Sequence, residues 1–172
     1  MNNQNQTAYA KIVQLVERNI IGKPQIIIVS VNTLNKGQTL IDKICSELTL
    51  CDGIINGQIK NQSVKLSNQG YAHGFIARQY SSGQILRYTY TCAPVQESTQ
   101  ITVYGNDGEI RFYSETDKIF TLKQIPDYVG DEVTENIPTD GVIDFERGKV
   151  GKTLVSQNNL KENQKIACEF AK

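Results

Sequence analysis

The 172-residue chain has no tryptophan, one histidine and one methionine. Zinc enzymes commonly use two or three histidine ligands, so a single histidine argues against such a site in this chain. No C-x-x-C spacing occurs, which excludes zinc-knuckle and thioredoxin-type motifs. We therefore expect no metal and no cofactor. We expect the four thiols to pack as small apolar groups in a reducing compartment; they belong to Cys45, Cys51, Cys92 and Cys168.

Long apolar segments are also missing. The longest apolar run is Ile26–Val29, whereas a helix that crosses a bilayer needs roughly 20 apolar residues. Residues 1–7 are rich in Asn and Gln and have neither the basic nor the apolar region of a signal peptide. The sequence thus predicts an intracellular protein, in the cytoplasm or nucleus, with no membrane contact.

Recognisable catalytic and nucleotide motifs are absent as well. Gly151-Lys152-Thr153 resembles the end of a phosphate-binding loop, but the first glycine of that motif would fall at Glu146. A carboxylate there would repel phosphate. The acidic residues of segment 126–141 do not follow the calcium-loop order. These absences predict that the protein is not an enzyme and has no catalytic residues.

The first third of the chain predicts a helix, a strand and a second helix. Apolar residues recur at helical spacing from Tyr9 to Ile20, which predicts a helix over 7–21 with Thr7 as its N-cap. Residues 25–31 are β-branched and apolar, as in a covered strand. Apolar spacing and a capping-box pattern predict a short helix over 39–49.

After Cys51 the periodicity becomes two, which indicates strands. Two hairpins are expected, 73–79 with 84–92 and 100–104 with 109–114, because their turns carry residues that tolerate positive φ. The remaining expectations are a strand over 119–123, a loop over 126–141, a hairpin of 142–146 with 150–155, and a tail, 160–171, that is either a strand or a weak helix.

These elements predict an α+β fold, in which an N-terminal helix–strand–helix covers a mostly antiparallel β meander, with an OB-like small barrel as one form of it. A single domain over 1–172 is expected from the length. Its expected segments are 1–52 (helix–strand–helix), 53–125 (meander), 126–141 (acidic loop) and 142–172 (C-terminal hairpin and tail).

Charge is balanced overall, with 18 basic and 18 acidic residues, but it is unevenly distributed. Segment 53–96 has no acidic residue and a net charge of +4, while 107–146 has a net charge of −8. Tyr and Arg are favoured at interface hot spots, and the same pair of residue types binds single-stranded nucleic acid. The predicted binding residues, all placed on one exposed sheet face, are Arg78, Tyr80, Arg87, Tyr104, Arg111 and Tyr113.

The function predicted from these features is a non-catalytic protein–protein interaction subunit of a larger assembly. The layout of residues 53–155 resembles the OB-fold subunits of replication protein A or the telomeric CST complex. That resemblance implies an alternative, a subunit that contacts single-stranded nucleic acid directly or through partners. Two further alternatives are an enzyme in which His73 acts as a base and a surface or pilus-like protein with disulfides.

Overall fold

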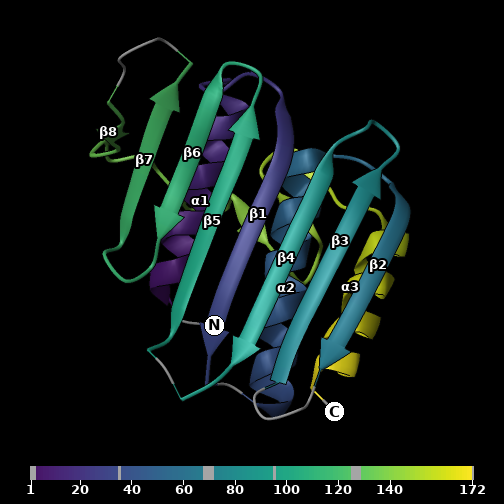
Figure 1. Cartoon of the computed structure of the whole chain (residues 1–172). Coiled ribbons are helices and arrows are strands. Elements are labelled where there is room, and N and C mark those ends of the chain that lie inside the picture. Colours follow the sequence, from purple (N-terminus) through teal and green to yellow (C-terminus); the bar gives the residue numbers. More distant parts are fainter. Residues whose placement is uncertain (1–2, 35, 68–71, 95, 125–128, 172) are drawn as a thin grey trace.

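The computed structural model describes residues 3–34, 36–67, 72–94, 96–124 and 129–171. Figure 1 shows one large twisted sheet with the helices on one of its faces. The helices are α1 (Asn3–Glu17), α2 (Gly37–Ile55) and α3 (Gln157–Phe170). None of the described helices is long and apolar enough to cross a membrane.

Over the described ranges the large sheet has eight strands in the order β2-β3-β4-β1-β5-β6-β7-β8. The strands are β1 (Pro24–Thr33), β2 (Ile59–Ser67), β3 (Ala72–Tyr80), β4 (Ile85–Cys92), β5 (Ser98–Gly105), β6 (Gly108–Tyr113), β7 (Lys118–Lys123) and β8 (Asp131–Glu132). A small second sheet contains β9 (Ile143–Asp144), β10 (Lys149–Val150) and β11 (Thr153–Leu154).

The predicted β meander and OB-like barrel are wrong. Strand β1 pairs in parallel with β4 and antiparallel with β5, so it separates the two predicted hairpins instead of preceding a meander. Parallel neighbours need a crossover connection, which α2 and the β2–β3 pair supply here. Among the described residues β2 and β8 lie at opposite edges of an open sheet.

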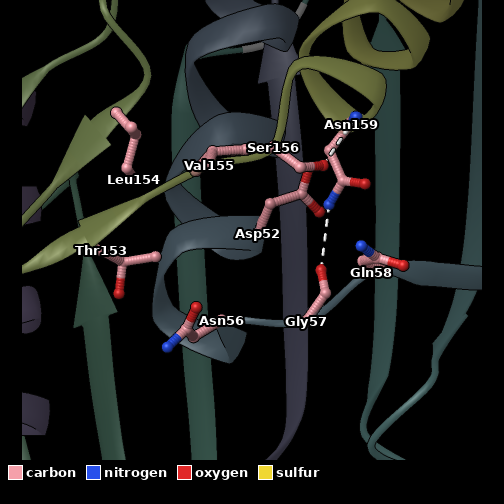
Figure 2. A pocket seen from close by; sticks show the side chains of 9 residues that line it. All are labelled: Asp52, Asn56, Gly57, Gln58, Thr153, Leu154, Val155, Ser156 and Asn159. Atoms are coloured by element: carbon pink, nitrogen blue, oxygen red, sulfur yellow. Dashed lines mark hydrogen bonds between the residues drawn. The ribbon is translucent and has the colours of Figure 1, made fainter.

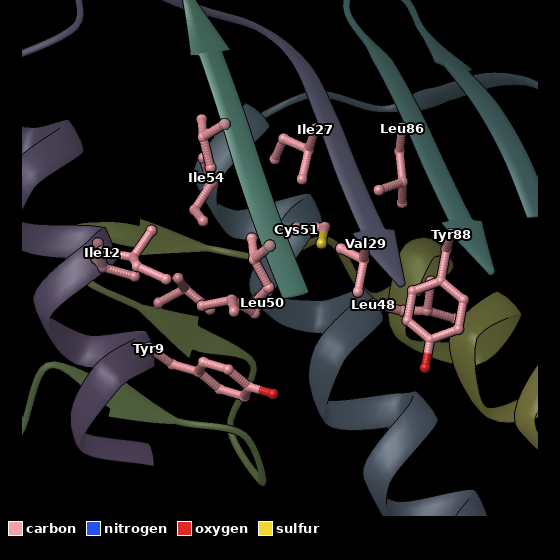
Figure 3. Close-up of a cluster of buried hydrophobic side chains, with 14 of the residues drawn as sticks. Tyr9, Ile12, Ile27, Val29, Leu48, Leu50, Cys51, Ile54, Leu86 and Tyr88 are labelled. Carbon is pink, nitrogen blue, oxygen red and sulfur yellow. The ribbon is translucent and has the colours of Figure 1, made fainter. Parts of the chain in front are cut away.

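The core lies between the sheet and the helices. Figure 3 shows side chains of α1, α2, β1 and β4 meeting there. The predicted helix over 39–49 continues to Ile55, because Cys51, Ile54 and Ile55 are also buried. Gly53 lets α2 pack closely against β10, since a Cβ at this position would overlap the side chain of Val150. The helix ends at Ile55, and Asn56 caps it in a left-handed conformation, with φ of 53°.

Local predictions succeeded where turn chemistry is strong. Both central hairpins form, as β3–β4 and β5–β6. The first helix begins at Asn3, so Thr7 is inside it and is not its N-cap. The tail is helix α3, capped by Ser156, whose Oγ accepts a hydrogen bond from the Asn159 N–H at 3.2 Å. Strand β2 was missed, and part of the predicted loop 126–141 lies outside the described residues.

Candidate functional site

Helix α2 carries two carboxylates into the interior of the protein. Glu47 and Asp52 have exposed fractions of 1% and 2%. A buried carboxylate needs charged or hydrogen-bonding partners, because leaving water costs several kcal/mol for an ion. Each of the two carboxylates is the centre of a separate network.

The Glu47 network is complete. Tyr9 donates its phenol hydrogen to Oε1 at 2.8 Å, and Tyr88 donates to Oε2 at 2.6 Å. Lys43, one turn earlier on α2, places Nζ 2.9 Å from Oε1 and 3.1 Å from the Thr99 hydroxyl. Burial, and then the charge of Glu47, raise the pKa of both tyrosines well above 10, so both phenols remain hydrogen-bond donors.

The Asp52 network joins α2 to β3 and α3. Arg78 Nη1 lies 3.1 Å from Oδ1 and 3.2 Å from Oδ2, and both side chains have no exposed surface. Tyr80 donates its phenol hydrogen to Oδ1, and Asn163 Nδ2 donates to Oδ2 at 3.0 Å. Arg78 Nε also donates to Gln62 Oε1 at 2.7 Å. Asp52 therefore accepts two contacts on each oxygen.

Desolvation dominates the electrostatics of this network. Burial raises the pKa of the Asp52 carboxyl, while Arg78 and the phenol of Tyr80 act in the opposite direction. Burial also raises the pKa of Tyr80 well above 10. Two buried atoms, Arg78 Nη2 and Asn163 Oδ1, have no hydrogen-bond partner among the described residues. The network thus has one donor and one acceptor unmatched.

A polar pocket of about 210 Å³ opens next to this network (Figure 2). Three segments form it: the end of α2, the connection into β2, and the chain from β11 into α3. The residues that line it are Asp52, Asn56, Gly57, Gln58, Thr153, Leu154, Val155, Ser156 and Asn159. We call this cavity the α2–α3 pocket.

Asn159 connects two parts of the pocket wall. Asn159 Nδ2 donates to the backbone oxygen of Gly57 at 3.0 Å and so ties α3 to the segment after α2. Its backbone N–H donates to Ser156 Oγ. The carboxyl end of α2 and the amino end of α3 therefore meet at one cavity, and their opposite dipole charges partly cancel there.

The six predicted binding residues do not form one surface. Arg78 and Tyr80 are on the helix-covered side, with exposed fractions of 1% and 0%. The other four are on the uncovered sheet face: Arg87, Tyr104, Arg111 and Tyr113. Strands β1 and β5 separate Arg87 on β4 from Arg111 on β6. Arg111 is already paired with Glu109, at 2.5 Å between Nη2 and Oε1. A binding role for the four uncovered residues stays a prediction.

Glu47 and Asp52 were missed as site residues, although a signal existed. Glu47 lies between Ile44 and Leu48 on the apolar stripe of α2, where an acid needs a buried partner. Arg78 likewise alternates with Ile76 and Tyr80, so the three share a face of β3. The alternation therefore groups Arg78 with two residues that favour burial, although it does not say which face of the sheet the helices cover.

The described residues do not fit a metal or a dinucleotide. They contain no group of three or more His, Cys, Asp or Glu residues placed to hold a metal ion. Dinucleotide sites use a glycine-rich turn that opens a helix above a mostly parallel sheet. In the described residues the large sheet has one parallel pair, and helix α2 begins at Gly37 without a glycine-rich run before it.

No protein-family model matches the chain, and a search of curated proteins gives no match. Solved structures do share its fold, and those reported below are dehydrogenases and oxidoreductases. The chain is thus similar in fold to dehydrogenase-type enzymes.

Three of these structures illustrate the similarity. The chain matches levoglucosan dehydrogenase, in a complex with NADH and levoglucosan, with a TM-score of 0.64 and 12% identity, over 98% of this chain and 63% of that one. It matches UDP-N-acetylglucosamine 3-dehydrogenase from Acidithiobacillus ferrooxidans with a TM-score of 0.66 and 9% identity, over 95% and 58%. It matches an oxidoreductase domain protein from Kribbella flavida with a TM-score of 0.63 and 11% identity, over 98% of this chain and 60% of that one.

The chain spans 58% to 63% of the length of these three structures. Their fold overturns the predictions of a non-enzyme, of a non-catalytic interaction subunit and of an OB-fold nucleic-acid-binding subunit. The expected partners, protein subunits or single-stranded nucleic acid, are wrong for the same reason. At these identities the similarity establishes the fold and leaves the activity to be proposed.

Proposed function

We propose that these residues act as the substrate-side domain of a dehydrogenase-type enzyme, the part that contacts a small-molecule substrate. One observation carries the proposal: dehydrogenase structures match 91–98% of this chain, whereas the chain matches little more than half of each of them. The part of those structures that this chain matches corresponds to its open mixed sheet with helices on one face.

The division of labour follows from the sheet. Dinucleotides bind at the carboxyl edge of doubly wound parallel sheets, and the described residues form a sheet of another kind. We assign the nucleotide contacts of the enzyme to residues other than those described. This chain would instead recognise the alcohol or carbonyl compound, in keeping with the levoglucosan bound by one of the matching dehydrogenases.

The test is to incubate the purified protein with a metabolite extract and to identify the retained compounds by mass spectrometry. NADH binding is followed separately by its fluorescence. We expect retention of an alcohol or carbonyl compound and no saturable NADH binding. Retention of no small molecule would overturn the substrate-side role, and saturable NADH binding would overturn the division of labour.

A further inference from the structure

We propose that the α2–α3 pocket binds a small uncharged molecule with several hydroxyl or amide groups. This inference goes beyond the proposed function, because it concerns the pocket itself, whether or not its ligand is the substrate. It depends on the size of the pocket, on the unused hydrogen-bonding groups in its wall and on the balance of charge around it.

The volume suits a compact molecule. A volume of about 210 Å³ corresponds to roughly seven water molecules at about 30 Å³ each. Two stretches that are far apart in the sequence, 52–58 and 153–159, meet at its wall, and Asn159 bridges them through Gly57. A ligand held between these segments would therefore bind to the folded state and stabilise the junction of α2 and α3.

The wall offers free polar groups. Within the described part of the chain, the side chains of Asn56, Gln58 and Thr153 make no hydrogen bond. Two amides and a hydroxyl provide both donors and acceptors, which a hydroxyl or amide group of a ligand can match. In Figure 2 Thr153 and Asn56 lie to the left of Asp52, and Gln58 lies to its right, below Asn159.

Charge around the pocket is balanced. Among the described residues that line the wall, Asp52 is the one that carries a charge. Arg78 neutralises it, and its oxygens already accept contacts from three residues. A cationic ligand would find no free carboxylate there. An anionic ligand would find no free Lys or Arg in the wall, and the carboxyl end of α2 opposes the attraction of the α3 amino end. An uncharged ligand avoids both penalties.

The experiment compares three probes that share one open six-carbon chain and differ in charge: D-glucitol (neutral), D-gluconate (anion) and D-glucamine (cation). Each is titrated into the isotope-labelled protein while backbone amide resonances are followed by NMR. We expect glucitol to shift the resonances of Gln58, Thr153 and Asn159. Gluconate and glucamine should bind at least about tenfold more weakly.

Two variants and a control locate the binding. Thr153→Leu reduces the pocket and removes a hydroxyl, and Gln58→Ala removes an amide without adding bulk. Each should weaken glucitol binding about tenfold, whereas Thr102→Leu on the uncovered sheet face should leave it unchanged.

Three results would overturn the proposal. They are equal or tighter binding of gluconate or glucamine, shifts at residues outside the pocket, and no shift by glucitol up to its solubility limit. If metabolites are retained while glucitol leaves the pocket unchanged, the proposed function stands and this inference fails. If glucitol binds the pocket while no metabolite is retained, the reverse holds.

Discussion

The two faces of the large sheet handle charge in opposite ways. On the helix-covered face Arg78 is buried and paired with Asp52, whereas nine residues later on the same hairpin Arg87 lies exposed on the other face. The covered face contains two complete or nearly complete carboxylate networks and the α2–α3 pocket. A binding role can therefore be assigned to an arginine of this sheet only when it is known whether the helices cover the face that carries it.

The largest contrast should come from the same substitution at the two arginines. Arg78→Met leaves the Asp52 carboxylate buried and unpaired, which we expect to lower the free energy of unfolding by about 3–5 kcal/mol. Arg87→Met on the uncovered face should change it by less than about 0.5 kcal/mol. Urea unfolding followed by circular dichroism measures both, and equal losses would remove the distinction between the faces.

The second largest effect should be a loss of stability at alkaline pH, which originates on the covered face. Tyr9, Tyr80 and Tyr88 have pKa values raised well above 10, first by burial. The unfolded chain loses these protons near pH 10 while the folded protein keeps them. Stability from this source is therefore complete below pH 10 and falls above it, by up to about 4 kcal/mol per pH unit for three groups.

Equilibrium unfolding measured at several alkaline pH values tests this slope. Tyr88→Phe should reduce it by about 1.4 kcal/mol per pH unit, because one of the three groups no longer titrates. The chain has eight tyrosines, so the absorbance test compares two folded proteins. Tyrosinate absorbance that the folded wild type shows and folded Tyr88→Phe lacks would contradict the buried, protonated state of Tyr88.

Neutralising one carboxylate on each side of the sheet should give a smaller difference in stability. Glu47→Gln replaces a charged acceptor of two phenols by a neutral one, and we expect a loss of about 2 kcal/mol. Glu109→Gln removes the partner of Arg111, whose side chain is 41% exposed, and should cost less than about 1 kcal/mol. Thermal unfolding of the two variants at neutral pH gives the difference, and a greater loss for Glu109→Gln would count against the account.

The smallest expected effect concerns the start of α3. Ser156→Ala removes the hydroxyl that accepts the Asn159 N–H and should cost about 1 kcal/mol. Ser63→Ala, an exposed serine of β2, serves as the control and should be nearly neutral. If Ser156→Ala also left the free energy of unfolding unchanged, the Ser156 hydroxyl would not stabilise the start of α3.

Local features of this fold could be predicted, and long-range ones could not. The turn residues of 80–83 and 105–108 specify their hairpins over a few positions. The parallel pairing of β1 with β4 joins Ile27 to Leu86, which are far apart in the sequence, and no local pattern encodes it. Strand β2 was missed because it is a polar edge strand with little apolar alternation.

The candidate site was misplaced for a related reason. Alternation along β3 and β4 shows which side chains share a face, but it does not say which face the helices cover. Arg78 and Tyr80 were therefore predicted to lie on the surface, while their partner Asp52 belongs to a helix whose end was set too early, at residue 49. The site depends on α2 reaching Ile55 and on the tail folding as α3.

The central claim is that the α2–α3 pocket, on the helix-covered side, binds a small uncharged molecule. The most direct test is to add a metabolite extract to the labelled protein and to map which backbone amides shift. The account predicts shifts at Gln58, Thr153 and Asn159. Shifts concentrated instead at Ile28 and Thr102, on the uncovered face, would contradict it.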